Sequence, residues 1–555
     1  MRGLNMKQKA MKTLSIYIGI IGMLLLAVLP AKAASEAEFR KLSKTYTLRA
    51  DGSQEVRVQK ELTLFTHAAM NSLYGETFIV YDPDFQKLEI HESYTRQKDG
   101  NVIKTPANAL VEVLPSAAAN APAYNRLKEM VVVHTGLELG ATIVLDYSIV
   151  SKAGYLPELD VCCPVKELSP IKEYTFRLNV PAGKAVHYEL LNASAKPAIS
   201  QGSGMKTFTW TLKDVKPRPY AYPSARGAMG QVQAVSSGMM PVFIASTWPR
   251  YDEALKSLKA QFQPGSHSII EAKVAELTRG IEGNPQAIRN AIAGYMTELY
   301  QLGRCGVSLQ EAGYRLRPAS EVIRSAYGTQ AELVNLDVTL QQAAGLEAEV
   351  AVCALRPSTK DNQGLSTLVS VVAQSKLMPE KVALTGTEEA CLQPFLTVTN
   401  LEGKPLTMEA YLSAKDMQQT DTLQVDEAQM QQPAEGWGIV ALPDPTPIRT
   451  LYAYAAHTTI PESILLPRTM NCTLETFVRL PEGMKVTPRT DMEVSNACGK
   501  VTFSYQPTKD GVKVTRSLRI SRQLQTPSNY KELYALLAEW RDANNHTLVV
   551  KKTAE

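Results

Sequence analysis

The sequence predicts a multidomain protein with an N-terminal β-sandwich, a central α+β domain and a C-terminal, mostly β domain. Period-two alternation of apolar residues dominates the first and last parts of the chain, and helical periodicity dominates only the middle. A chain of 555 residues is also too long for a single core. The expected boundaries are 1–33 for a signal peptide, 34–240 for the sandwich, 241–425 for the central domain, 426–460 for a linker and 461–555 for the C-terminal domain.

The first 33 residues indicate export. A basic start, which includes Arg2 and Lys12, precedes an apolar run from Leu14 to Leu29, and Ala31-Lys32-Ala33 fits a signal peptidase site. The apolar run is short for a membrane span, so we expect cleavage, with an uncleaved anchor as the alternative. Cleavage would lower the formal net charge from +4 to −1, which gives no reason to expect nucleic acid or an anionic membrane as a partner. We therefore expect a periplasmic or secreted protein with no membrane span after cleavage.

The segment from Ser43 to Val215 has the pattern of many short strands. Apolar residues alternate on both sides of the turn at 50–53, which predicts a hairpin. A two-sheet sandwich is the fold that many short strands with Gly, Pro and Asp turns favour. Further strands are expected around Leu88–Ile90, Ile143–Ile149, Tyr174–Val180 and Phe208–Leu212, and the Pro-rich stretch 216–223 is expected to be a linker.

We expect new structure to begin at Val242. From Tyr251 onward, the apolar residues have helical spacing. Asn284-Pro285 is a strong helix start, and the last helix begins at Gln330 and is closed by Gly345. Helices first and a sheet afterwards describe an α+β domain. The other expected elements are helices at Tyr251–Gln261, at Ile269–Arg279 and from Pro318, and strands at Ala348–Leu355, Ser366–Val372 and Phe395–Thr399.

Residues 426–460 are rich in Gln and Pro and have little periodicity, so we expect an extended connection there. Alternation returns beyond Ser463 and predicts a β domain with one helix near its end. Its expected elements are strands at Leu474–Leu480, Val501–Tyr505, Val512–Ile520 and Thr547–Val550, and a helix at Asn529–Ala543.

Cysteine and histidine spacing excludes several kinds of chemistry. Seven cysteines include no CxxC pair, so the chain is no disulfide scaffold, and Cys472 with Cys498 is the best candidate pair. The histidines are scattered singly without HExxH or other ligand spacing, and no phosphate-binding or dinucleotide motif appears. We therefore expect neither a metal nor a cofactor.

The run from Tyr327 to Leu336, with its expected buried helix and the strand after it, resembles the transglutaminase-like fold. In that family a Gly-x-Cys run places a nucleophilic cysteine at the start of the helix, where backbone N–H groups and the helix dipole favour a thiolate. Gln330 stands at the position of that cysteine, and an amide is not a nucleophile.

The resemblance also implies a histidine on a later strand and a carboxylate that orients it. The strand from Phe395 is expected at the place of the histidine strand, and Glu409 near that of the carboxylate. No histidine lies between His267 and His457, so both the nucleophile and its base are missing.

The first domain carries a second resemblance. The turns at 51–53, 81–83 and 98–100 and the run from His134 to Ala141 resemble a domain of unknown function that precedes transglutaminase-like domains in exported bacterial proteins. This resemblance implies no activity.

These observations favour an exported pseudoenzyme, a catalytically inactive transglutaminase-like protein that binds or scaffolds at the cell envelope. Its ligand would be a protein, a peptide or a glycan. The alternative is an active cysteine hydrolase or acyltransferase that acts on peptide or peptidoglycan amides through a relocated nucleophile. Cys305 is the candidate substitute, with His267 upstream, whereas Cys353 is expected to be a buried strand residue. A third hypothesis assigns the function to the loops of the two β domains.

Overall fold

The computed structural model describes residues 35–553, except 166, 218–239, 356–359, 378–380, 385–395, 411–416, 428–429, 456–457, 459–463, 467–468, 523 and 527. The expected signal peptide, most of the Pro-rich stretch, Cys391 and His457 thus lie outside the described residues. Over the ranges that are described, no helix is both long enough and apolar enough to cross a membrane.

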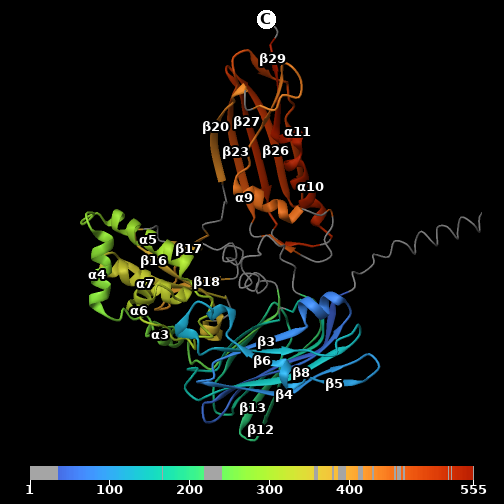
Figure 1. Ribbon diagram of the computed structural model, residues 1–555, viewed down its shortest axis with the longest axis vertical. Coiled ribbons are helices and arrows are strands. Elements are labelled where there is room, and N and C mark those ends of the chain that lie inside the picture. The colour runs from blue at the N-terminus through green and yellow to red at the C-terminus, as the bar shows by residue number, and fades with distance from the viewer. Residues whose placement is uncertain are drawn as a thin grey trace, which may run out of the picture. The chain divides into compact units, whose positions relative to one another are not determined.

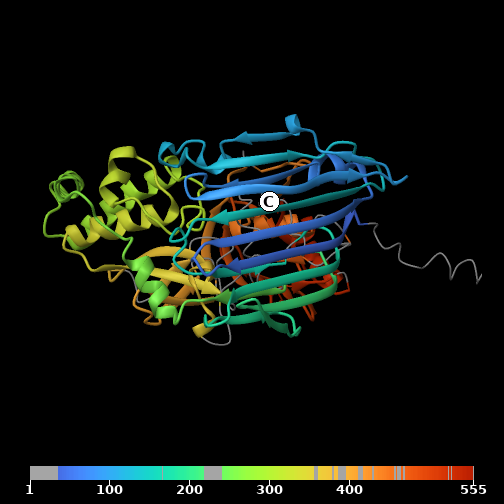
Figure 2. The same cartoon turned by 90° about the horizontal axis from the view of Figure 1, so that it is seen from below.

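An eight-stranded sheet forms the larger layer of the N-terminal domain (Figure 2). Strands β1 (Ala37–Leu48) and β2 (Gln54–Leu64) form the predicted hairpin, with Gly52 at a φ of 82° in the turn. The strand order is β12-β13-β10-β1-β2-β8-β4-β5, in which β1 runs parallel to β10. The other strands are β4 (Gln86–Arg96), β5 (Val102–Lys104), β8 (Thr142–Ser151), β10 (Ile171–Pro181), β12 (Ala198–Gly202) and β13 (Met205–Val215).

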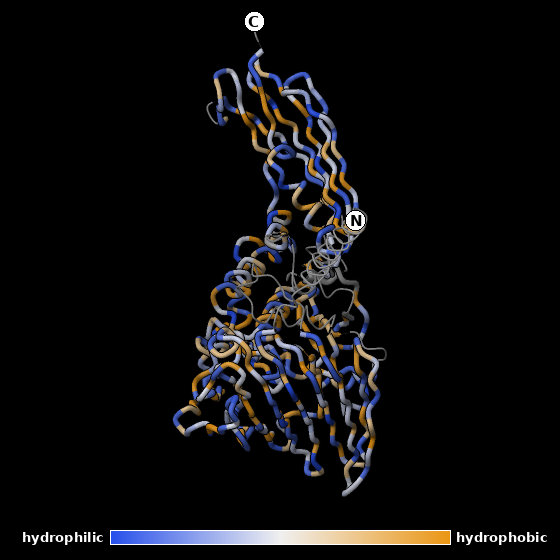
Figure 3. The backbone as a smooth tube through the Cα atoms, turned by 90° about the vertical axis from the view of Figure 1, so that its right-hand side faces the viewer, coloured by the Kyte–Doolittle hydropathy of each residue, from blue (hydrophilic) through white to orange (hydrophobic). Residues whose placement is uncertain are grey.

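Two three-stranded sheets cover one face of the large sheet. One has the order β3-β7-β6, and the other has the order β11-β14-β9. Phe243 of β14 stacks on Phe176 of the large sheet with 4.3 Å between ring centroids, and Ile79 of β3 packs with Leu145. The strands are β3 (Glu76–Tyr81), β6 (Leu110–Val113), β7 (Lys128–Val133), β9 (Asp160–Pro164), β11 (His187–Leu191) and β14 (Val242–Ser246). Figure 3 shows the apolar and polar residues that alternate along such strands.

Strand β14 differs from its prediction, because it completes a sheet with β9 and β11 and does not simply begin the central domain. Its Phe243 and Ala245 face the core of the sandwich. Its Val242 and Ile244 point the other way and pack with Cys353 of the central sheet. All five residues of β14 are buried, so one strand supplies apolar surface to two cores.

The central region contains the predicted helices followed by a small sheet. The sheet order is β16-β15-β18, and β17 and β19 form a separate parallel pair. Asn284 caps α5 by accepting a hydrogen bond from the N–H of Ala287 at 3.1 Å. The elements are α3 (Tyr251–Lys259), α4 (His267–Thr278), α5 (Pro285–Leu302), α6 (Ala319–Ser325), α7 (Gln330–Ala343), β15 (Ala348–Leu355), β16 (Leu368–Ser375), β17 (Lys381–Leu384), β18 (Leu396–Asn400) and β19 (Thr407–Ala410).

Helix α7 is the most enclosed of these elements. Leu333, Leu336 and Leu340 are fully buried among the other helices. Val334 and Val338, on a different side of α7, pack with the central sheet. The bounds of α7 and β15 confirm the predicted buried helix and following strand.

A buried carboxylate fastens β9 to the turn at Leu365–Thr367. Asp160 accepts hydrogen bonds from the N–H of Ser366 at 3.3 Å and from the hydroxyl of the same residue. Gly364 is required beside it, because a Cβ at that position would collide with the carboxylate. Burial raises the pKa of Asp160 to about 6, although the hydrogen bonds from Ser366 oppose this shift.

The C-terminal domain has a five-stranded sheet of order β20-β23-β27-β26-β25 and a three-stranded sheet of order β21-β29-β24 (Figure 1). Helix α10 packs its fully buried Leu533, Leu537 and Trp540 against the larger sheet. The elements are β20 (Met417–Gln424), β21 (Trp437–Ala441), α9 (Thr446–Arg449), β22 (Ile464–Leu465), β23 (Met470–Arg479), β24 (Met484–Val486), β25 (Met492–Asn496), β26 (Gly499–Thr508), β27 (Gly511–Ile520), β28 (Leu524–Gln525), α10 (Tyr530–Arg541), α11 (Ala543–His546) and β29 (Thr547–Lys552).

The segment 426–460, expected to be a linker, is part of this domain in the structure. It contains β21, which pairs with β29, and its Ile448 and Leu451 are fully buried in the C-terminal core. Strand β20, which lies within the range expected for the central domain, pairs in parallel with β23. Its mostly exposed, polar residues carry no alternation that would indicate a strand.

The structure has no bond between Cys472 and Cys498. Cys472 lies on β23, and Cys498 lies directly before β26, with β27 between these two strands. Two strand spacings amount to roughly 9 to 10 Å, which is too far for a disulfide. The Cys498 thiol instead accepts a hydrogen bond from the side-chain amide of Gln525 at 3.5 Å.

Candidate functional site

The start of α7 is where the resemblance would place a nucleophile. Thr329 caps the helix, since its hydroxyl accepts a hydrogen bond from the N–H of Glu332 at 3.3 Å. The Glu332 carboxylate in turn accepts from the N–H of Thr329 at 3.0 Å, which completes a capping box. Gln330 is the first residue of the helix, as predicted.

Both the nitrogen and the oxygen of the Gln330 side-chain amide form hydrogen bonds. Its nitrogen donates to the Ser370 hydroxyl at 3.2 Å and to the Val371 carbonyl at 3.3 Å, both on β16. Its oxygen accepts from the Arg304 guanidinium at 3.2 Å. The side chain therefore bridges the helix to the strand that lies beside it.

The strand that faces Gln330 is β16, and not the strand from Phe395 that the sequence suggested. The latter is β18, which pairs with β15 on the side away from β16. The prediction failed because the order of strands in a sheet cannot be inferred from their order in the chain. Ser370 thus lies within reach of Gln330, and Glu409 lies on β19, where the structure describes the backbone pairing with β17.

Glu332 is a fully buried carboxylate that joins three parts of the chain. It accepts hydrogen bonds from the Tyr124 hydroxyl at 2.6 Å and from the backbone N–H of Arg317 at 2.9 Å. It also forms an ion pair with the guanidinium of Arg317 at 3.0 Å. Tyr124 belongs to the loop before β7 of the N-terminal domain, so this cluster ties the sandwich to the start of α7.

Arg317 is saturated with partners. Besides Glu332, it donates to the Ser325 hydroxyl at 3.1 Å and to the Tyr327 carbonyl at 2.7 Å, and it lies 4.4 Å from the centre of the Tyr327 ring. Burial opposes its charge, but the contacts with Glu332 outweigh burial and raise the pKa of Arg317. Burial and the Glu332 carboxylate raise the pKa of Tyr124 well above its ordinary value, so the phenol remains a donor.

The charges at the start of α7 are balanced. The carboxylate of Glu332 accepts the N–H of Thr329 and is paired with the Arg317 guanidinium. The charged group that contacts Gln330 itself is the guanidinium of Arg304. What this position lacks for thiol chemistry is the sulfur, since an amide is not a nucleophile.

Cys305, the candidate substitute nucleophile, is buried with 8% of its surface exposed. It packs with Ala118, Ala121 and Tyr124 of the N-terminal domain. Burial is the main cause that raises the pKa of its thiol, and the charged groups that act on it are Glu332 and Arg317. His267 begins α4 and is not among the groups that act on this thiol.

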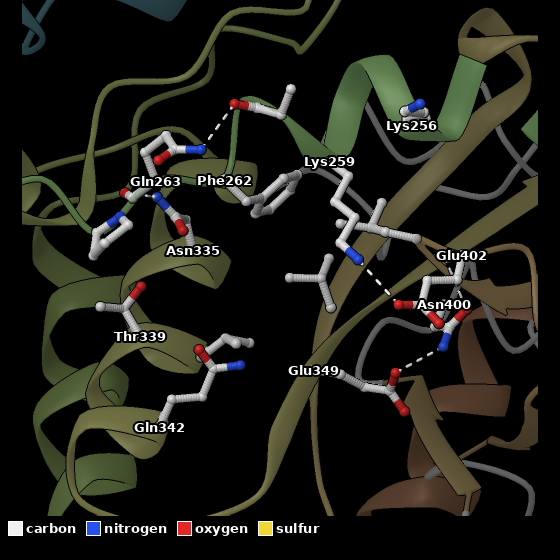
Figure 4. Close-up of a pocket in the computed structure, with 15 residues that line it drawn as sticks. Lys256, Lys259, Phe262, Gln263, Asn335, Thr339, Gln342, Glu349, Asn400 and Glu402 are labelled. Atoms are coloured by element: carbon white, nitrogen blue, oxygen red, sulfur yellow. Dashed lines mark hydrogen bonds and ion pairs between the residues drawn. The ribbon is translucent and has the colours of Figure 1, made fainter. Parts of the chain in front are cut away.

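A groove of about 680 Å³ lies on another side of α7 (Figure 4). It is lined by α3 and the loop after it, by α7, by the start of β15 and by the turn after β18. Its lining combines polar side chains with apolar ones, among them Phe262, Val338 and Leu401. The labelled residues are Lys256, Lys259, Phe262, Gln263, Asn335, Thr339, Gln342, Glu349, Asn400 and Glu402.

Hydrogen bonds hold the walls of the groove in place. Lys259 forms an ion pair with Glu402 at 3.0 Å, and the amide of Asn400 donates to Glu349 at 2.9 Å. On the helix side, Asn335 donates to the Gln263 carbonyl at 2.9 Å. These contacts leave the hydroxyl of Thr339 and the amide oxygens of the helix lining the cavity, so the groove offers both donors and acceptors to a polar ligand.

The part of the chain that the structure describes contains no group of three His, Cys, Asp or Glu residues placed to hold a metal ion.

Comparisons with known proteins agree with this architecture. A model of the domain of unknown function DUF3857 matches residues 50–219, and a model of the domain of unknown function DUF3858 matches residues 439–550. The fold and these matches define a multidomain, β-rich protein in which two domains of unknown function flank a central region.

A crystal structure of a protein from Parabacteroides distasonis ATCC 8503, described as a candidate protease, is similar along nearly the whole chain. The two proteins are 35% identical with a TM-score of 0.78, and the match covers 93% of this chain and 99% of that chain. The chain therefore belongs to the family of this Parabacteroides protein.

Other matches are far weaker. Two structures of an M1 zinc metallopeptidase from Deinococcus radiodurans, one of them a mutant bound to a Tyr-Ser-Ala substrate, are each 12% identical to this chain, with TM-scores of 0.19 and 0.20. They cover 39% and 38% of this chain and 44% and 42% of their own chains, and they carry no argument. No curated protein matches the sequence.

Proposed function

We propose that this chain is an exported, catalytically inactive protein with a transglutaminase-like central domain, and that it binds a ligand at the cell envelope. The observation that carries the proposal is Gln330. Gln330 begins the buried helix α7 at the position where transglutaminase-like proteins have their nucleophilic cysteine. Its amide is hydrogen-bonded to Ser370 and Arg304. A side chain without nucleophilic character fills the place where the chemistry would occur.

The surroundings of the substitute cysteine also support inactivity. Cys305, the substitute nucleophile, is packed among apolar side chains and has a raised pKa, which is the opposite of what activates a cysteine.

The groove beside α7 supports the binding role. Its polar side chains, together with Phe262 and other apolar residues, suit a ligand that has both hydrogen-bonding groups and apolar surface, such as a peptide or a glycan. Its lining residues come from four parts of the chain, which hydrogen bonds and an ion pair hold together, so the cavity is formed before the ligand arrives.

Activity assays test the first half of the proposal. Purified mature protein should hydrolyse neither casein nor a dipeptide amide and should crosslink no glutamine-containing peptide to an amine. The Gln330→Cys variant should remain inactive, because the partners of residue 330 in the described part of the chain are Arg304, Ser370 and Val371, and none of them is a histidine that could deprotonate the new thiol. Thiol-dependent hydrolysis by the wild type that disappears in Cys305→Ser would overturn inactivity and favour a cysteine hydrolase, which the description of the Parabacteroides relative suggests.

Binding assays test the second half. Peptidoglycan sacculi and a panel of their soluble peptide and glycan fragments are suitable probes. Thr339→Arg would fill the groove, so this variant should no longer be retained on the fragment that the wild-type protein binds. Thr297→Arg, on the exposed side of α5, is the matched control and should bind like the wild type. If the Thr339→Arg and Thr297→Arg proteins are retained equally, the ligand binds outside the groove.

A further inference from the structure

The α7 side of the groove is uncharged. Asn335, Thr339 and Gln342 line it from one side of the helix, at spacings of four and three residues. Across the cavity they face Glu349 and Glu402 (Figure 4). We call Asn335, Thr339 and Gln342 the α7 wall. At 1.5 Å per residue, this wall extends over roughly 10 Å, so an extended ligand can contact it at several points.

The amide nitrogens of the α7 wall are hydrogen-bonded within the protein. The nitrogen of Asn335 donates to the Gln263 carbonyl at 2.9 Å, and that of Gln342 donates to the Ala348 carbonyl at 2.9 Å. Among the residues that the structure describes, none donates to the two amide oxygens, and none is hydrogen-bonded to the Thr339 hydroxyl. Asn335 is only 3% exposed, so its oxygen can gain a partner only from a molecule inside the groove. The α7 wall therefore presents mainly acceptor atoms to a ligand.

The remaining lining is apolar or electrically balanced. Phe262 packs against the apolar cluster that contains Val338, Val350 and Leu401. The core thus holds these four side chains in place, and they give the groove an apolar part. The charged lining residues are two lysines and two glutamates, so their formal charges cancel, and the groove does not favour a ligand with a large net charge. These residues are Lys256, Lys259, Glu349 and Glu402.

We propose that the groove binds an oligosaccharide, whose hydroxyl groups donate to the α7 wall and whose C–H groups pack on Phe262. This inference rests on the proposed function, because it names the ligand class of the same groove. A hydroxyl both donates and accepts, so it can satisfy an amide oxygen as well as the Thr339 hydroxyl. A sugar ring also has apolar C–H surface beside its hydroxyls, which matches the mixed lining.

An extended peptide matches the α7 wall less well. Its N–H groups on one side recur every second residue, roughly 6.4 to 6.8 Å apart. The positions of the α7 wall are separated by about 6 and 4.5 Å along the helix axis, so a peptide strand meets two of the three acceptors in register. Adjacent carbons of a sugar carry hydroxyls, and a sugar chain thus offers donors at a closer spacing. An acceptor left without a donor in the enclosed groove costs affinity.

Calorimetry with the whole mature protein tests the ligand class. The probes are chitotriose, cellotriose, maltotriose and the soluble glycan and peptide fragments of peptidoglycan. At least one of the oligosaccharides should bind, Thr339→Arg should remove this binding, and Thr297→Arg should bind like the wild type. If peptide fragments bind through the groove and no oligosaccharide does, the proposed function stands and this inference is overturned. If no probe binds, the binding role and this inference both fail.

Conservative variants test the role of the α7 wall. Thr339→Val removes one hydroxyl at nearly constant volume and should weaken the oligosaccharide affinity by about fivefold, whereas Thr297→Val should leave it unchanged. Gln342→Leu should have a similar effect, because it removes an acceptor from an exposed side chain. Gln342→Glu keeps an acceptor and should retain binding. The inference is overturned if none of these changes alters oligosaccharide binding, or if Gln342→Leu and Gln342→Glu lose it equally, because the acceptor would then not matter.

Discussion

The start of α7 and the turn beside β9 show two different ways in which this chain encloses a carboxylate. At the start of α7, Glu332 is paired with Arg317, and both side chains have further hydrogen-bond partners. Asp160 on β9 accepts hydrogen bonds from Ser366, and no cation is among the groups that shift its pKa.

The difference decides what each charge does for stability. The paired carboxylate of Glu332 holds parts of the chain together, because its removal leaves Arg317 without a counter-ion. The ionised carboxylate of Asp160 lacks such a counter-ion, so its charge costs stability, and its protonated form is favoured. Removal of the charge should therefore have opposite effects in the two places.

The largest effect should come from Glu332→Ala. This change leaves the buried Arg317 without its counter-ion and the Tyr124 hydroxyl without its acceptor, so we expect a loss of about 3 to 5 kcal/mol in the free energy of unfolding. Urea denaturation measures it. Glu321→Ala breaks the exposed pair with Arg324 on α6 and should cost no more than about 0.5 kcal/mol. Similar losses in the two variants would contradict the structural role of Glu332.

A smaller effect should follow the protonation of Asp160. Its pKa rises from 3.8 to about 6 on folding, so the folded state binds the proton more tightly than the unfolded state does. The contribution of Asp160 to the free energy of unfolding should therefore be most favourable below pH 4. It should fall by at most about 3 kcal/mol as the pH rises to about 6. The measurement is the difference between wild type and Asp160→Asn in urea denaturation at several pH values. A difference that does not change with pH would show that the carboxyl is already ionised.

Much of the fold could be predicted where the signal is local. Periodic leucines and a closing glycine located α7, and the Asn-Pro start located α5. Strand β20 could not be predicted, because its mostly exposed, polar residues at the edge of the sheet show no alternation of apolar side chains. The pairing of β14 with β9 and β11 depends on contacts between residues far apart in the chain.

The candidate site was predicted only in part. Gln330 was found through its place at the start of a helix, but the Tyr124 contact with Glu332 joins residues 208 positions apart and has no local signal. Thr329 and Glu332 have the spacing of a capping box, which could have indicated Glu332.

Strand β14 has a consequence for work with fragments of this protein. The DUF3857 match ends at residue 219, yet the strand that completes the sheet of β9 and β11 lies at Val242–Ser246. A recombinant fragment that stops at 219 would expose unpaired edges on both of those strands, which invites aggregation. The segment that the DUF3857 model matches is thus shorter than the segment that a soluble fragment of the N-terminal domain would need.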